Sequence, residues 1–150
     1  YKRSNSRGVF FKNPASDEEI FITPEKDMEI QLDLNTDIAM CLDSMPLIQQ
    51  SKSQVAEAVE KTISWAARCK EHHDKLQKKI PEPKRQLLWG IVQGGLHEDL
   101  RKKCANEMAK MNFDGYSIGG LALGEPKESE YKIVKFTKQF IHTFQGKFQN

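Results

Sequence analysis

The first forty residues carry two short apolar runs and then a segment with helix-start signals. The runs are Gly8–Phe11 and Glu19–Ile22, and between them lies Asn13–Asp17, whose residues are typical of turns. This order predicts a β-hairpin. A Thr-Pro-Glu sequence follows at 23–25 and supplies an N-cap, a proline at the first helical position and an acid in the first turn, so we predict a helix from Pro24 to about Leu34.

From residue 37 onward, short apolar runs alternate with segments of helical period. The runs are Ile38–Leu42, Leu87–Val92 and Gly115–Ile118. The first helical segment opens with capping-box spacing at Ser51 and Gln54. The three helical segments carry apolar faces made of Val55, Val59, Thr62, Ala66 and Cys69, then Leu96, Leu100, Cys104, Met108 and Met111, then Ile133, Phe136, Phe140, Ile141 and Phe144. The pattern predicts three consecutive βα units.

Strands that alternate with helices favour a parallel sheet with crossover helices, either in an eight-stranded barrel or in a doubly wound sheet. Three units cannot close a barrel, which needs eight. We therefore assign the chain to the α/β class, as a partial (β/α)8 TIM barrel of about three consecutive βα units preceded by a β-hairpin and a helix. Residues 1–150 are then expected to be a fragment of a single TIM-barrel catalytic domain whose N-terminal and C-terminal parts are missing, which the first residue, Tyr1 rather than Met, also favours.

Polar and small residues follow the three predicted strands. Asp43 comes after the first strand, Gln93 after the second and the Gly119-Gly120 pair after the third. Ligands bind outside the carboxyl ends of parallel strands, so these residues would border one cavity. A carboxylate accepts two hydrogen bonds, an amide both donates and accepts, and glycine lets the backbone approach a flat ligand. Together they suit the edge of a guanine-like base.

Each of these residues also has a purely structural interpretation. Asp43 can begin a loop, Gln93 can satisfy buried backbone groups, and the Gly-Gly pairs at 94–95 and 119–120 can form tight turns. A phosphate cradle at either pair is a further alternative, although neither has G-x-G-x-x-G or P-loop spacing. The joint placement at three successive strand ends favours the base pocket.

Composition adds information about compartment and metal binding. Hydrophobic residues make up 38% and charged residues 29% of the chain, which is ordinary for a globular protein, and no apolar stretch is long enough to cross a bilayer. Cys41, Cys69 and Cys104 are far apart and lack metal-ligand spacing, which indicates a reduced, cytoplasmic protein without a metal site in this segment. His72 and His73 point in different directions from a helix, and we interpret both as solvated.

The net charge of +2 is too small to indicate nucleic-acid binding. Two local basic clusters, Lys75–Lys79 and Arg101–Lys103, are typical of solvated helix faces. Contact with tRNA through them is the less favoured interpretation.

Several short segments of the chain have recognisable sequences: Gly8–Phe11, Phe21–Lys26 with Glu29–Gln31, Ser64–Cys69, Gly90–Gly95 and Gly115–Pro126. In this order they resemble segments of the tRNA-guanine transglycosylases, also called queuine tRNA-ribosyltransferases. The resemblance covers nearly the whole chain. It implies a (β/α)8 barrel transferase of queuosine biosynthesis that exchanges the guanine at the tRNA wobble position for a 7-deazaguanine base, through a covalent ribosyl-enzyme intermediate.

The resemblance also implies roles for residues. In that family the positions that match Asp43, Gln93 and Gly120 hold the base, and the backbone beside Leu121 lies near its aminomethyl group. The catalytic aspartate, within an Asp-Ser-Gly-Gly-Phe-Gln motif, would precede residue 1, and the nucleophilic aspartate, the tRNA-contacting loops and a Cys/His zinc site would follow residue 150. We therefore expect no catalytic residue in this segment, zinc in the full-length protein only, tRNA and a deazaguanine base as partners, no membrane contact, and a homodimer or heterodimer at full length. The segment alone is expected to be inactive.

Two positions bear on which base is used. After Asp43 the chain has Ser44-Met45-Pro46, where many bacterial members have Glu-Cys-Thr-Pro, so we expect a different pocket floor. Leu123 stands where eukaryotic members carry a glycine that makes room for the larger queuine ring. Leucine therefore favours the smaller pre-queuosine base.

Two other functions stay open at this point. A noncatalytic subunit could hold tRNA or a companion chain, because barrel relatives can lose their chemistry and keep their shape, although the joint presence of Asp43, Gln93 and Gly120 disfavours it. An unrelated barrel enzyme could act on a small phosphorylated substrate, but a phosphate-binding loop would then be expected and is not seen in the sequence.

Overall fold

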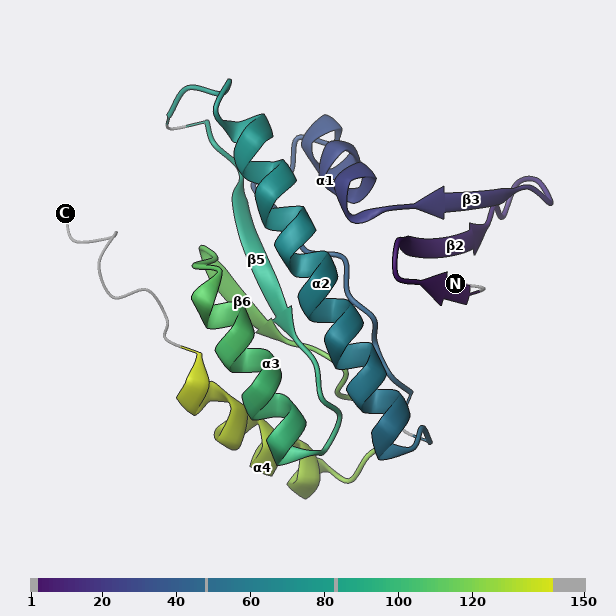
Figure 1. Ribbon diagram of the computed structural model, residues 1–150, viewed down its shortest axis with the longest axis vertical. Coiled ribbons are helices and arrows are strands. Elements are labelled where there is room, and N and C mark those ends of the chain that lie inside the picture. The colour runs from purple at the N-terminus through teal and green to yellow at the C-terminus, as the bar shows by residue number, and fades with distance from the viewer. Residues whose placement is uncertain (1–2, 48, 83, 142–150) are drawn as a thin grey trace.

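The computed structural model describes residues 3–47, 49–82 and 84–141. An antiparallel sheet comes first and contains β1 (Arg3–Asn5), β2 (Gly8–Lys12) and β3 (Glu19–Ile22), in that order. A parallel sheet follows with β4 (Ile38–Met40), β5 (Leu87–Val92) and β6 (Gly115–Ile118) side by side. The helices are α1 (Pro24–Asp33), α2 (Lys52–Gln77), α3 (Glu98–Lys110) and α4 (Lys127–Thr137), with a short 3-10 helix at Lys138–Phe140 (Figure 1).

The predicted α/β class, hairpin, first helix and three βα units are confirmed. Helix starts follow the predicted chemistry: Lys26 N–H donates to Thr23 Oγ1 at 3.2 Å at the start of α1. At the start of α2, Gln54 N–H donates to Ser51 Oγ at 3.4 Å and Ser51 N–H donates to Gln54 Oε1 at 2.9 Å, which completes a capping box. The sequence pattern did not predict β1, and β4 is shorter than expected.

Helices cover one face of the parallel sheet. Ala39, Leu88 and Val92 point toward α2 and α3 and are 0–1% exposed. The opposite face carries Ile38 and Leu87, each 38% exposed, because side chains alternate along a strand. Within the described residues this second apolar face is therefore not packed into the core.

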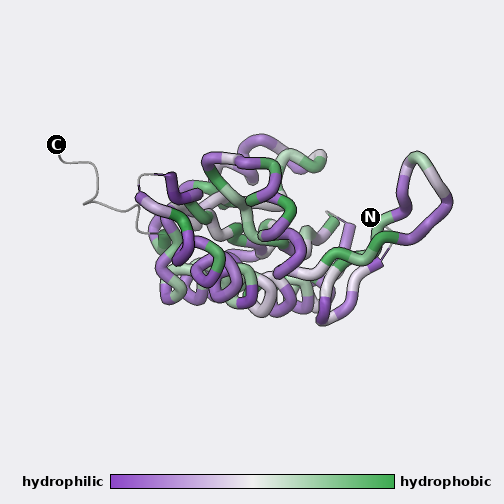
Figure 2. Tube along the Cα trace, turned by 90° about the horizontal axis from the view of Figure 1, so that it is seen from above, coloured by the Kyte–Doolittle hydropathy of each residue, from purple (hydrophilic) through white to green (hydrophobic). Residues whose placement is uncertain are grey.

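The hairpin stands out sideways from the helices and the parallel sheet (Figures 1 and 2). Two side chains of α2 attach its base. Trp65 is fully buried and donates from Nε1 to the carbonyl of Ser6 at 2.9 Å. Arg68 donates to both carboxylate oxygens of Glu25 at 2.7 and 2.6 Å and to the carbonyl of Arg7 at 3.0 Å, and it lowers the pKa of Glu25 to about 2. One helix thus fixes both the hairpin and α1.

The expectation that both histidines are solvated was wrong for His73. It is 3% exposed on the inner face of α2, and burial lowers its pKa. His72 is partly buried and lies 3.3 Å from a carboxylate oxygen of Glu29. A 26-residue helix packed along the sheet buries even its polar positions when they fall on the inner face.

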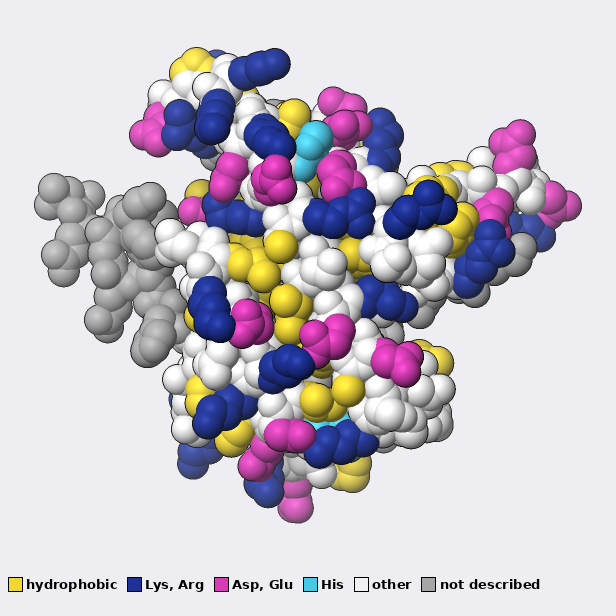
Figure 3. Space-filling view, viewed as in Figure 1, with side chains coloured by type: hydrophobic (Ala, Val, Ile, Leu, Met, Phe, Trp, Pro, Cys, Tyr) yellow, Lys and Arg dark blue, Asp and Glu magenta, His cyan; other side chains and the backbone are white. Residues whose placement is uncertain are grey.

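The two basic clusters behave differently. Lys75 pairs with Glu71 across one helical turn at 2.6 Å, as a solvated helix face does, and Figure 3 shows charges of both signs mixed over this side of the molecule. Arg101 in the second cluster is fully buried, so its interpretation as a solvated residue was wrong.

One expectation about the helix faces was wrong, and another concerns a residue outside the described ranges. Leu96 precedes α3 and is 40% exposed, because the helix begins at Glu98 rather than before it. Phe144 falls outside the described residues. All three cysteines are buried and free. No helix among the described residues is long and apolar enough to cross a membrane.

Candidate functional site

The three predicted strand ends meet at one place. Gln93 follows β5 directly and is 1% exposed. Its Nε2 donates a hydrogen bond of 2.5 Å to Oδ2 of Asp43, which comes after β4. The fold therefore brings the predicted carboxylate and amide into direct contact, on the same side of the sheet.

The two glycines after β6 lie against the Gln93 side chain. A Cβ atom at Gly119 would lie 2.6 Å from Gln93 Nε2, and one at Gly120 would lie 2.3 Å from Gln93 Oε1. Gly120 also has a φ of +66°, in the left-handed region that glycine adopts at little cost. Only glycine lets this backbone approach Gln93 so closely, and the three predicted site residues form one group.

The amide of Gln93 has unused hydrogen-bonding capacity. Oε1 is buried and has no hydrogen-bond partner among the described residues. Nε2 carries two N–H groups, and Asp43 accepts one of them. A buried acceptor without a partner is costly, and the close approach of Gly120 encloses this oxygen, so the second N–H group of Nε2 is the part of the amide that a ligand can use. Beside a carboxylate, this amide can hold a molecule that both donates and accepts.

A second carboxyl group lies close to the site. Burial raises the pKa of Asp43, while the hydrogen bond from Gln93 acts in the opposite direction. Asp27 of α1 has its pKa raised to about 6, mainly by burial and further by the charge of Asp43, against the effect of a hydrogen bond from Gln31. Sequence reasoning missed Asp27, since an acid in the first turn of a helix has an ordinary explanation as a helix-start residue.

Gln31 connects this second carboxyl to the sheet. Its Nε2 donates to Asp27 Oδ2 at 3.0 Å and to the carbonyl of Met40 at 2.8 Å, and its Oε1 accepts from Met40 N–H at 2.8 Å. Met40 is the last residue of β4, three positions before Asp43. The position of α1 is therefore fixed relative to the strand that carries the site carboxylate.

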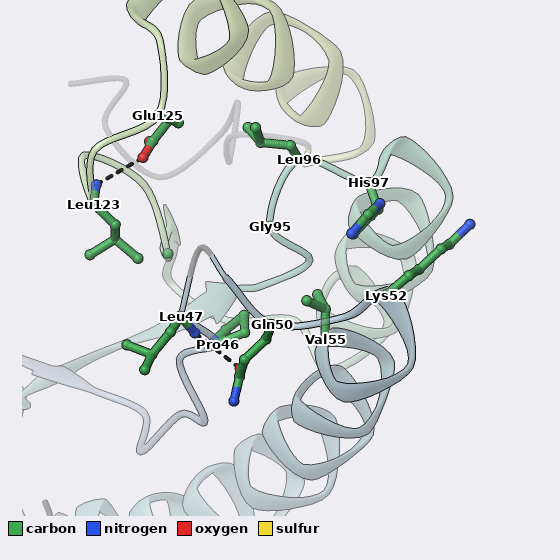
Figure 4. Close-up of a pocket in the computed structure, with 11 residues that line it drawn as sticks. Pro46, Leu47, Gln50, Lys52, Val55, Gly95, Leu96, His97, Leu123 and Glu125 are labelled. Atoms are coloured by element: carbon green, nitrogen blue, oxygen red, sulfur yellow. Dashed lines mark hydrogen bonds between the residues drawn. The ribbon is translucent and has the colours of Figure 1, made fainter.

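A cavity of about 220 Å³ adjoins this group and includes Gly120. Figure 4 shows that it opens between the loops that follow β4, β5 and β6 and the start of α2. In the last loop, the Glu125 carboxylate accepts from the N–H groups of Ala122 and Leu123 at 2.5 and 2.9 Å. The remaining lining residues are Pro46, Leu47, Gln50, Lys52, Val55, Gly95, Leu96 and His97.

The lining is largely apolar with a few polar groups, as in most small-molecule pockets. Among the described residues, no group of three or more His, Cys, Asp or Glu side chains is arranged to hold a metal ion. The arrangement is thus suited to recognise a planar polar molecule by hydrogen bonds.

Comparison with known proteins adds independent information. The model of the Queuine tRNA-ribosyltransferase family matches residues 1–144. A Queuine tRNA-ribosyltransferase of Staphylococcus aureus (strain bovine RF122 / ET3-1) is 40% identical over 140 residues, which are 93% of this chain and 35% of that protein. The protein of the same name from Staphylococcus aureus strain JH9 is 39% identical over 140 residues, again 93% of this chain and 35% of the relative. The chain spans about a third of the length of these curated relatives.

Proposed function

Because the chain belongs to the queuine tRNA-ribosyltransferase family, we propose that it is a segment of a transferase that replaces the guanine at the tRNA wobble position with a 7-deazaguanine base. The observation that carries the proposal is the contact between Asp43 and Gln93 beside Gly120. In this proposal the three residues bind the base, and the adjoining cavity receives the group attached to its seven-position.

The hydrogen-bonding capacities of base and site are complementary. The ring N–H and the exocyclic amino group of guanine both donate, and the Asp43 carboxylate accepts two hydrogen bonds. The ring carbonyl oxygen accepts from the second N–H of Gln93 and from the backbone N–H of Gly120. Hydrogen bonds to a charged group contribute about 1.5 to 3 kcal/mol each, so Asp43 supplies a large part of the affinity.

We assign the parallel sheet to a (β/α)8 barrel. In a closed barrel one face of every strand packs inside, and the exposed apolar face with Ile38, Leu87 and the partly buried Trp89 is suited to that position. The parallel sheet contains three of the eight strands that a barrel needs, and this share is close to the 35% of the relative's length that the chain spans. Residues 1–150 then form part of one barrel domain. The remaining strands of the barrel close it around the exposed apolar face of this sheet.

The rest of the proposal concerns the full-length protein. The two aspartates of catalysis, the zinc site and the tRNA-contacting loops lie in the remaining chain, so this segment contributes base binding and no catalytic residue. We place the enzyme in the cytoplasm, with tRNA and a deazaguanine base as partners, as a homodimer or heterodimer. The free, buried cysteines agree with a reducing compartment.

Leu123 bears on the choice of base. It lines the cavity that adjoins Gly120. Since this cavity receives the group attached to the seven-position in the proposal, a leucine side chain there leaves less room for the ring of queuine than a glycine would. We therefore propose the pre-queuosine base, with its small aminomethyl group, as the preferred substrate.

The test is a base-exchange assay with the full-length enzyme. Labelled guanine in the wobble position of tRNA should be released when pre-queuosine base is supplied, and tRNA with adenine at that position should not react. Binding of tRNA is measured in parallel. An enzyme that is folded and binds tRNA but exchanges none of guanine, pre-queuosine base and queuine contradicts the proposal and supports a noncatalytic subunit instead.

A further inference from the structure

Arg101 is a fully buried cation directly behind the candidate base site. It belongs to α3, and its guanidinium donates to three backbone carbonyl oxygens. Nε donates to Gly95 at 2.8 Å, and Nη1 donates to Val92 at 2.7 Å and to Gly119 at 2.8 Å. These carbonyls belong to the end of β5 and to the loops that follow β5 and β6. One side chain therefore connects the two loops that carry Gln93 and Gly120.

Burying the charge of Arg101 at this position costs free energy. Burial lowers the pKa of Arg101 to about 10, which still leaves the side chain charged at neutral pH. The hydrogen-bond partners are neutral carbonyl oxygens, and Nη2 is buried without a partner among the described residues. An apolar side chain at this position would remove the donors that Arg101 supplies to three carbonyl oxygens.

The contact with Gly119 fixes the direction of a neighbouring donor. The carbonyl of Gly119 and the N–H of Gly120 belong to one peptide group, and in a trans peptide they point in opposite directions. Arg101 holds the oxygen toward α3, so the Gly120 N–H points away from α3. Gly119 N–H donates to Val92 O at 3.0 Å, and Arg101 binds that same oxygen, so the loop is fixed relative to β5.

We propose that Arg101 is a positioning residue for base recognition. It orients the peptide between Gly119 and Gly120 so that the Gly120 N–H donates to the ring carbonyl oxygen of a purine-type base held by Asp43 and Gln93. This inference rests on the proposed function and adds to it a residue that does not touch the base. Substitution of Arg101 should therefore weaken binding of ligands that carry the carbonyl acceptor and have little effect on binding of ligands in which that acceptor is weak.

The test compares two bases that differ at this one atom. Guanine carries the carbonyl oxygen, and 6-thioguanine carries sulfur, a weaker acceptor, in its place. Inhibition constants for both are measured on the full-length enzyme, unsubstituted and with Arg101→Met or Arg101→Lys. We expect Arg101→Met to reduce the preference for guanine over 6-thioguanine by about tenfold, the effect of one hydrogen bond to a carbonyl. Arg101→Lys keeps the charge and part of the donor set, so it should restore part of the preference.

Met108→Ala is the matched control. Met108 is fully buried on the same helix, and removing its side chain loosens α3 without removing a donor to the three carbonyls. This variant should keep the preference for guanine. Equal weakening of both bases, or an unchanged preference, in the Arg101 variants overturns the assignment, and Arg101→Lys decides the question if Arg101→Met does not fold. Failure of the unsubstituted enzyme to bind either base overturns the proposed function itself, which is a distinguishable result.

Discussion

Gln93 Nε2 donates a hydrogen bond of 2.5 Å to Asp43 Oδ2, across 50 positions of sequence. Parallel pairing of β4 with β5 creates this contact, because Met40 pairs with Trp89 and the two strands end at the same edge. The amide already orients the carboxylate before any ligand arrives. A base that binds here therefore meets a preorganised acceptor, which reduces the entropy lost on binding.

Asp43→Asn should weaken binding of guanine by about 10-fold to 100-fold, since the substitution replaces a charged acceptor by a neutral group that also donates. Calorimetric titration of the full-length enzyme with guanine measures the effect. Asp37→Asn serves as the control, because Asp37 is an exposed acid just before the opposite end of β4. Equal affinities in the Asp43→Asn variant and the unsubstituted enzyme would show that this carboxylate does not bind the base.

Gly120→Ala should abolish base binding while costing only moderate stability. Alanine in the left-handed region costs about 1 to 2 kcal/mol, and here its Cβ must also displace Gln93 from Asp43. Gly95→Ala is a matched control: its φ is +56°, but the nearest atom to its Cβ would be 3.6 Å away. Both variants should therefore show the cost of backbone strain in thermal unfolding, with a larger loss for Gly120→Ala because Gln93 must also move, and only Gly120→Ala should lose affinity for guanine. A parallel loss of affinity in both variants would assign the effect to backbone strain.

Local signals were enough to predict most of the fold. The capping box at Ser51 and the proline at position 24 define helix starts by contacts within four residues, so the sequence contains them directly. The meeting of Asp43 and Gln93 also followed from a general rule about the carboxyl ends of parallel strands. β1 was missed because Arg-Ser-Asn has no apolar pattern, and pairing with β2 alone makes it a strand.

The errors in the site have a tertiary origin. Arg101 lies in a run of three basic residues that looks like a surface cluster, and only the carbonyl oxygens brought to α3 by two separate loops make a buried position possible. His73 is similar, since the inner face of α2 is decided by how the helix packs on the sheet. Asp27 shares its environment with Asp43 only after α1 packs beside β4.

Leu123→Gly should shift the preference of the full-length enzyme from pre-queuosine base toward queuine. The leucine lines the cavity that adjoins Gly120, and its removal enlarges the space that, in the proposal, receives the group attached to the seven-position of the base. Competitive binding of the two bases measures the change. The unsubstituted enzyme should prefer pre-queuosine base, so tighter binding of queuine before any substitution contradicts this interpretation of Leu123. Leu47→Ala, in the loop after β4 that lines the same cavity, tests whether any enlargement has the same effect.

Asp27→Asn should make the protein more stable at neutral pH and have little effect in acid. The pKa of Asp27 is raised from 3.8 to about 6, so the folded state binds this proton more tightly than the unfolded state does. Its favourable contribution is present below about pH 4 and is lost as the pH rises through 6, after which a buried charge opposes folding.

The displacement of this pKa corresponds to at most about 3 kcal/mol, and partial exposure reduces the expected gain to about 1 to 2 kcal/mol. Urea unfolding of the unsubstituted and substituted proteins at pH 4 and pH 8 gives the difference in free energy of unfolding, which should be small at the lower pH and large at the higher. Asp33→Asn, at the exposed end of the same helix, is the control for removing an acid from α1. Since the charge of Asp43 contributes to the raised pKa, Asp43→Asn should reduce the gain from Asp27→Asn, and gains that add independently would show that the two carboxyl groups do not interact.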